Sequence, residues 1–167
     1  MRVIAIDPAL RKSGVAVLDD SSGSPEALHY GVITNPPKLK QSRCFVSIRD
    51  TIADLVRKYE PDECAVEGII FVQSHRTAIT MGAARGAAIL ACAEHGLPVY
   101  EYAPKRVKQA VVGCGTADKA QVSFMMRALL KLRETPPADA GDALAIGYAH
   151  LQASSALHPA FARGDEV

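Results

Sequence analysis

Four acidic residues stand where their side chains could act together: Asp7, Glu67, Asp139 and Asp142. Asp7 and Glu67 each end a short apolar run that is typical of a buried strand. Asp139 and Asp142 are three residues apart in an expected helix, which places both on one face. Taken singly, each acid has a structural explanation, as a turn residue, a solvated strand end or a charge that favours the helix dipole. Taken together, they indicate a shared site.

Four clustered carboxylates favour metal chemistry. Two unit charges 4 Å apart repel by about 4 kcal/mol at an effective dielectric constant of 20, so protons or cations must neutralise such a cluster. Ligands that are all oxygen select hard cations, Mg²⁺ or Mn²⁺. Two ions roughly 3.5–4 Å apart are the usual arrangement for in-line phosphodiester cleavage, in which they align the attacking water and stabilise the pentacovalent phosphate. We therefore expect two Mg²⁺ ions per subunit, with Mn²⁺ as a substitute.

The elements that must position these acids can be read from hydrophobic periodicity. Apolar runs predict strands at residues 2–6, 14–18, 27–34, 64–67 and 97–102. Helical spacing, Pro and Gly signals predict helices at residues 45–59, 77–95, 104–112, 116–132 and 138–152. A meander of three strands that continues into β–α–β crossovers gives an α/β fold, a five-stranded mixed sheet flanked by helices. We expect one domain over residues 1–154 and a disordered tail at 155–167.

Composition and charge narrow the class of protein. The 167 residues are 49% hydrophobic and carry a net charge of +1, which by itself says nothing about nucleic acid. Between residues 101 and 135, however, seven Lys and Arg face three acids. Such a run is a solvated helix face or a phosphate-binding surface. The candidate phosphate contacts on it are Lys105, Arg106, Lys108 and Lys119.

Several other classes lack their motifs. The sequence has no GxSxG and no GxxxxGK[ST], and its five His residues do not have zinc-ligand spacing. Its four Cys residues form no CxxC pair, which favours reduced thiols in a reducing cytoplasm. No apolar run reaches the roughly 18 residues of a membrane span, and the N-terminus does not resemble a signal peptide. We expect a cytoplasmic protein.

Longer segments resemble the RuvC family of bacterial Holliday-junction resolvases, which have a ribonuclease H-like fold. The resemblance covers about residues 1–152 and is carried by IDPALRKSGVAVL, AVEGIIF, MGAARGAAI, YEYAPKRVKQAVVGCGTADKAQV and ADAGDALAIGYAH. It implies a homodimer that binds four-way junction DNA in recombination and repair, nicks two like strands symmetrically and cooperates with the RuvA–RuvB branch-migration complex in the bacterial cytoplasm. It also implies the four acids as metal ligands and Lys108 and Lys119 as active-site lysines, since Lys is a compact cation suited to phosphate charge.

The sequence departs from the family pattern at two places. Ala9 replaces the glycine that usually follows Asp-Pro, which puts the geometry of that turn in question. The family's DNA-stacking aromatic would fall at Ile70, whereas the ring here is Phe71. Either Phe71 stacks after a small shift or Ile70 acts as an apolar wedge, and Phe71 could also be a core residue. Arg76 is a further candidate phosphate contact.

Three other functions fit parts of the sequence. A ribonuclease H-like nuclease acting on RNA or RNA/DNA hybrids would share the acids, but the block with Lys108 and Lys119 speaks against it. A junction-binding protein without cleavage would be expected to have lost an acidic ligand, and all four are present. An actin-like ATPase could use residues 7–14 as a phosphate loop, but the chain is too short for two lobes.

Overall fold

A computed structural model describes residues 1–69, 74–155 and 162–167. The strands are β1 (Arg2–Asp7), β2 (Lys12–Asp19), β3 (Glu26–Thr34), β4 (Glu63–Glu67), β5 (Val99–Tyr102) and β6 (Asp165–Glu166). The helices are α1 (Gln41–Tyr59), α2 (His75–Ala93), α3 (Pro104–Val112), α4 (Lys119–Leu129) and α5 (Ala138–Ser154). The helix predicted at residues 116–132 starts later than expected. α4 begins at Lys119 because Asp118 forms a capping box with Gln121.

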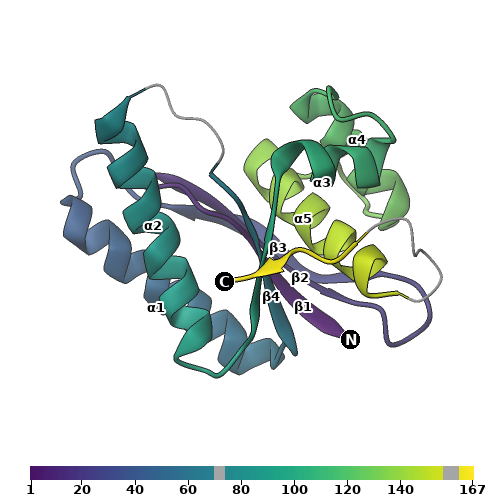
Figure 1. The fold of residues 1–167 in the computed structure, drawn as a ribbon, viewed down its shortest axis with the longest axis horizontal. Coiled ribbons are helices and arrows are strands. Elements are labelled where there is room, and N and C mark those ends of the chain that lie inside the picture. The colour runs from purple at the N-terminus through teal and green to yellow at the C-terminus, as the bar shows by residue number, and fades with distance from the viewer. Residues whose placement is uncertain (70–73, 156–161) are drawn as a thin grey trace.

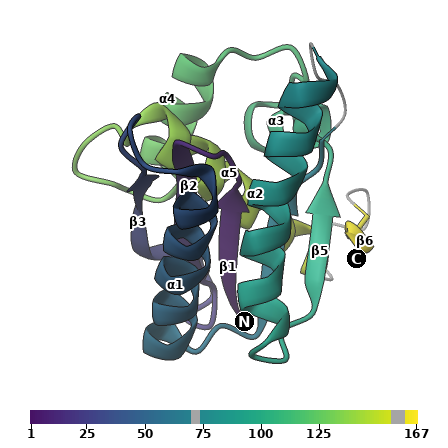
Figure 2. The same cartoon turned by 90° about the vertical axis from the view of Figure 1, so that its left-hand side faces the viewer.

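The strands form one mixed sheet in the order β3-β2-β1-β4-β5-β6. β1 to β3 form the predicted antiparallel meander, and β1, β4 and β5 run parallel. Figure 2 shows β1 and β5 pointing the same way. The predicted count of five strands is wrong by one, because β6 pairs antiparallel with β5. Two acidic residues give no periodic signal, so β6 was not visible in the sequence. It lies in the segment 155–167 that was predicted to be a tail, of which residues 156–161 are outside the described residues.

Helices cover both faces of the sheet (Figure 1). Because successive strand side chains point to opposite faces, Ile4 and Ile6 pack with α1 and α2, whereas Val3 and Ala5 pack with α3, α4 and α5. Both sets are fully buried. No helix in the described ranges is long and apolar enough to span a bilayer. The carboxyl ends of β1 and β4 lie between α2 on one side and α3 on the other (Figure 1).

A buried polar network anchors α5 to the sheet. The ring of His150, which is fully buried, is hydrogen-bonded through Nδ1 to the Tyr102 hydroxyl at 2.9 Å and through Nε2 to Glu63 Oε2 at 2.7 Å. Burial lowers the pKa of His150, so the ring is neutral at pH 7. Arg163 completes the network by pairing with Glu63 and stacking on the Tyr100 ring 4.0 Å away. The network ties α5, β4 and β5 to the C-terminal segment.

Candidate active site

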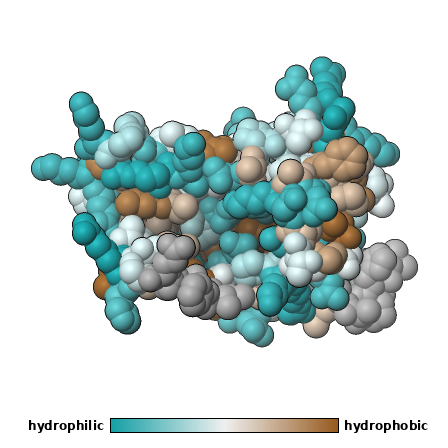
Figure 3. Space-filling view, turned by 90° about the horizontal axis from the view of Figure 1, so that it is seen from above, coloured by the Kyte–Doolittle hydropathy of each residue, from teal (hydrophilic) through white to brown (hydrophobic). Residues whose placement is uncertain are grey.

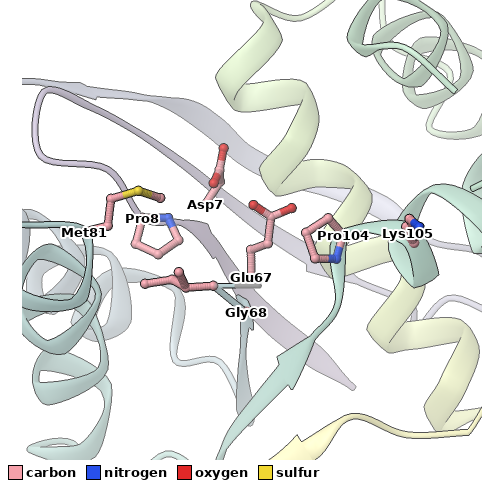
Figure 4. A pocket seen from close by; sticks show the side chains of 8 residues that line it. Asp7, Pro8, Glu67, Gly68, Met81, Pro104 and Lys105 are labelled. Atoms are coloured by element: carbon pink, nitrogen blue, oxygen red, sulfur yellow. The ribbon is translucent and has the colours of Figure 1, made fainter. Parts of the chain in front are cut away.

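The structure brings the predicted acids together at one edge of the sheet. β1 and β4 are parallel neighbours with Ile6 opposite Val66, so Asp7 and Glu67 end adjacent strands side by side. Both side chains point into the same space (Figure 4). The first turns of α5 lie over this edge, and carboxylate oxygens of Asp7, Asp139 and Asp142 lie within 4.8 Å of one another. Strand register and helix placement thus build the cluster.

Gly14 allows α5 to approach the sheet so closely. It lies opposite Asp7 in the β1–β2 ladder, and a Cβ atom there would be 1.9 Å from the backbone oxygen of Asp139. Any side chain at this position would push the start of α5 away from the sheet. This glycine was not singled out by sequence reasoning, although an isolated Gly within a strand pattern is a known signal of close backbone approach.

Replacing Gly14 by Ala should therefore damage the site without touching a carboxylate. We expect overpacking to destabilise the fold by about 1–3 kcal/mol and displacement of Asp139 to weaken Mn²⁺ binding by about 10–100-fold. Thermal unfolding and calorimetric titration with Mn²⁺ measure the two effects. The matched control is Gly31→Ala in β3, where the nearest atom to the new Cβ is 3.9 Å away. Equal behaviour of the two variants would contradict this role of Gly14.

The carboxylates perturb one another's protonation. Burial, followed by the charges of Asp142 and Asp139, raises the pKa of Asp7 to about 6. Burial and the charge of Asp7 raise the pKa of Glu67 to about 8. Without a cation, the cluster therefore holds protons near neutral pH, and Asp7 and Glu67 share a hydrogen bond. A set of half-buried, mutually repelling oxygen ligands is suited to a hard divalent cation.

Lys119, the first residue of α4, already supplies one positive charge. Its Nζ atom donates to Asp142 Oδ2 at 2.5 Å and lies 3.9 Å from Asp139 Oδ1. Burial opposes its charge, but the hydrogen bond to Asp142 and the nearby carboxylates outweigh burial and raise the pKa of Lys119. With 59% of its side chain exposed, Lys119 can also meet a ligand that enters from solvent.

A cleft of about 400 Å³ opens beside Asp7 and Glu67. Met81 of α2 forms one wall, and Pro104 and Lys105 at the start of α3 form the other (Figure 4). The acids lie at the base of the cleft, between an apolar wall and a cationic one. An extended anionic chain could enter along the cleft and place one phosphate over the carboxylates.

The other predicted DNA contacts have different surroundings. Lys105 lines the cleft, and Lys108 is half-buried further along α3. Arg76 is exposed in the first turn of α2. The Arg106 guanidinium donates to the backbone carbonyl of Ala162, so the terminal segment holds it in this structure. Arg106 is therefore engaged within the chain rather than directed only to solvent.

Ile70 and Phe71, the two alternatives for a stacking wedge, lie outside the described residues. The turn after β1 is described, and it accommodates Ala9. The Ser13 hydroxyl donates to the Ala9 carbonyl at 2.6 Å and accepts from the Ala9 N–H at 3.1 Å. Within the described residues, only Glu60 and Lys131 combine a side chain with a positive φ, so the backbone at Ala9 does not require glycine.

Comparison with known proteins gives one consistent result. The family model described as crossover junction endodeoxyribonuclease RuvC matches residues 3–150. The protein of that name from Akkermansia muciniphila is 54% identical over 157 residues, which cover 94% of each chain. The one from Halorhodospira halophila is 43% identical and covers 93% of this chain and 92% of its own.

Solved structures of similar proteins point to the same family. Thermus thermophilus RuvC has a TM-score of 0.81 and 34% identity, covering 90% of this chain and 93% of its own. T. thermophilus RuvC in complex with Holliday junction substrate has the same TM-score of 0.81, with 31% identity and the same coverage of 90% and 93%. The yeast mitochondrial Holliday junction resolvase Ydc2, with a TM-score of 0.58 and 11% identity over 87% of this chain and 75% of its own, shares the fold alone.

Proposed function

The chain belongs to the RuvC family of crossover junction endodeoxyribonucleases, and we propose that it resolves Holliday junctions by paired, symmetric, metal-dependent nicks at the carboxylate cluster. The observation that carries this proposal is the convergence of Asp7, Asp139 and Asp142 within 4.8 Å, beside Glu67 and Lys119. The ribonuclease H-like fold of the family places these acids where two strands and a helix meet. The reaction class is hydrolysis of a DNA phosphodiester.

The oxygen donors present fit hard divalent cations, and in this proposal Asp7, Glu67, Asp139 and Asp142 would hold two of them. When bound, Mg²⁺ or Mn²⁺ supplies Lewis-acid activation of water and of the phosphate. The cleft positions the DNA backbone across the acids. Lys119, at the edge of the cluster, stabilises the charge that accumulates on the phosphate, and Lys108 does the same from α3. The Lys105 side chain holds a neighbouring phosphate at the cleft wall.

Symmetric nicks on two strands require two active sites. A homodimer of this chain provides them, and its geometry sets the spacing of the nicks. In the cell we expect the dimer to act in the cytoplasm on junctions delivered by the RuvA–RuvB branch-migration complex. Residues 1–154 are the nuclease domain in this proposal.

Cleavage of a synthetic mobile four-way junction with Mg²⁺ tests the function. Linear duplex and RNA/DNA hybrid of the same sequence serve as comparison substrates. We expect symmetric nicks on the junction alone. Cleavage of the hybrid alone would indicate a ribonuclease that acts on RNA/DNA hybrids. Tight junction binding without nicks would indicate a junction-binding protein that does not cleave DNA. Either result would overturn the proposal.

Changing Lys108 to Ala should slow the chemistry far more than it weakens binding. Removing one donor to developing transition-state charge lowers rates by about 10²–10³-fold, whereas loss of one phosphate contact changes affinity by much less. Single-turnover cleavage and junction binding in Ca²⁺ separate the two effects. Lys58→Ala, at the far end of α1, is the control. A defect confined to binding would make Lys108 a phosphate clamp.

A further inference from the structure

The chain leaves the carboxylate cluster at Lys119 and returns to it at Asp139. The Nζ atom of Lys119 is 3.9 Å from Oδ1 of Asp139, although the two residues are twenty positions apart in the chain. The intervening segment is α4 and its connection to α5, at the upper left in Figure 2. The 11 residues of α4 extend about 16 Å at a rise of about 1.5 Å per residue. We call this segment, residues 119–139, the α4 excursion.

One face of α4 is fully explained by the fold. Val122, Ser123 and Met126 are buried. Gly141 of α5 packs so closely that a Cβ there would be 2.5 Å from Ser123 Oγ. This face fixes the helix against α5. The excursion is therefore a firmly attached element rather than a loose loop.

The other face of α4 carries an aromatic ring that the fold leaves uncovered. Phe124 is 62% exposed, and Arg127 follows one turn later on the same side. A single exposed apolar side chain is ordinary on a soluble protein, so the ring gains meaning only from the charges that share its segment. Arg127 also suits the C-terminal end of the helix dipole, but the dipole does not explain the ring.

Three cations share the α4 excursion with Phe124, Arg127 on the helix and Lys131 and Arg133 just beyond its end. Arg127, Lys131 and Arg133 are exposed, and no described acid forms an ion pair with any of them. By contrast, Arg57 on α1 and Arg85 on α2 pair with acids. The right-hand half of the molecule in Figure 3, over α3 and α4, is largely hydrophilic with hydrophobic patches between. An uncovered ring on a segment that also carries three unpaired cations suits a polyanion whose bases or sugars offer flat apolar faces.

We propose that this face of the α4 excursion, Phe124 with Arg127, Lys131 and Arg133, is a second DNA contact that holds a junction arm as it leaves the cleft. This inference rests on the proposed function, because the DNA must first enter the cleft. Phosphates of one DNA strand are spaced about 3.4 Å apart along the duplex axis. The length of α4, about 16 Å, therefore matches about five phosphates of that strand. The cations bind those phosphates, and the Phe124 ring packs on a deoxyribose or an unstacked base near the crossover.

Junction affinity as a function of salt tests the contact. Full-length variants Phe124→Ser and Arg127→Gln/Lys131→Gln are titrated with labelled four-way junction in Ca²⁺ over a range of NaCl concentrations. We expect Phe124→Ser to weaken binding at least about fivefold, with Phe124→Leu recovering part of the loss. The double variant should lower the log–log salt slope by about 1.8, since each phosphate contact contributes about 0.9. Thermal unfolding should not change for any of these exposed positions.

The controls are Val46→Ser and Arg57→Gln on α1, which remove an exposed apolar side chain and an exposed cation away from the α4 excursion. Wild-type affinity and slope in the α4 variants, with normal junction binding by the wild-type chain, would overturn this inference and leave the proposed function intact. A defect seen only when a partner protein is added would also overturn it, because the face would then bind protein. Failure of the wild-type chain to bind or cut junctions would instead refute the proposed function.

Discussion

The variant Asp7→Asn should bind four-way junctions as the wild-type protein does and fail to cut them. Asn has nearly the same shape but carries no charge, so the cluster loses a strong ligand for a divalent cation. Several kcal/mol of transition-state stabilisation depend on the metal ions, which corresponds to a fall in rate of at least about 10³-fold. In the proposed function, binding depends on contacts of Lys105 and Lys119 with the DNA backbone, so it should change little.

The same variant should be more stable than the wild-type protein when no metal is present. The raised pKa values of Asp7 and Glu67 mean that their charged forms are unfavourable in the folded protein. An amide at position 7 removes one of the repelling charges, and its oxygen can still accept a hydrogen bond from protonated Glu67. Thermal unfolding in EDTA, single-turnover cleavage in Mg²⁺ and junction binding in Ca²⁺ give the three readouts.

The control is Asp54→Asn, an acid on α1 whose side chain is 73% exposed. It should leave cleavage and binding at wild-type levels. An Asp7→Asn protein that unfolds at a lower temperature in EDTA would show that Asp7 is a structural acid. One that cuts junctions at more than a tenth of the wild-type rate would exclude it from the metal site.

Strand ends and helix spacing were enough to predict most of the site's framework. Asp7 and Glu67 end strands that hydrophobic periodicity alone identifies, and the parallel β1–β4 pair follows from the crossover between them. The i, i+3 spacing of Asp139 and Asp142 gives their common face. The period of the apolar pattern therefore predicts which side chains share an edge of the sheet or a face of a helix.

Long-range contacts between backbone atoms were not predictable in the same way. The close approach at Gly14 depends on where α5 docks, and the hydrogen bond from Arg106 to the Ala162 carbonyl joins residues 56 positions apart. β6 pairs through backbone groups that any sequence offers. None of these contacts leaves a periodic trace, because each depends on one glycine or one carbonyl rather than on a repeated apolar face.

Stability of the metal-free protein should fall as pH rises from about 5 to 8. Acids whose pKa is higher in the folded than in the unfolded chain bind more protons when folded, so each unit of pH above the unfolded value favours unfolding. The pKa of Asp7 is about 6 in the folded protein instead of 3.8, and that of Glu67 is about 8 instead of 4.5. Both acids therefore make the folded protein less stable as pH rises. Their combined effect is on the order of 3 kcal/mol after allowance for their coupling.

The comparison that isolates these two acids is between the wild-type protein and Asp7→Asn/Glu67→Gln. His150 has the opposite sign, because its pKa is lowered on folding and stability rises with pH through its titration. Since both proteins contain His150, its effect cancels in the difference.

In EDTA the wild-type unfolding temperature should fall by about 5–10 °C relative to the variant across this range. Saturating Mg²⁺ should abolish or reverse the trend, since the cation binds the deprotonated carboxylates. A wild-type curve parallel to that of the variant in EDTA would show that the cluster carries no shared protons and would remove the electrostatic basis for metal binding at this edge of the sheet.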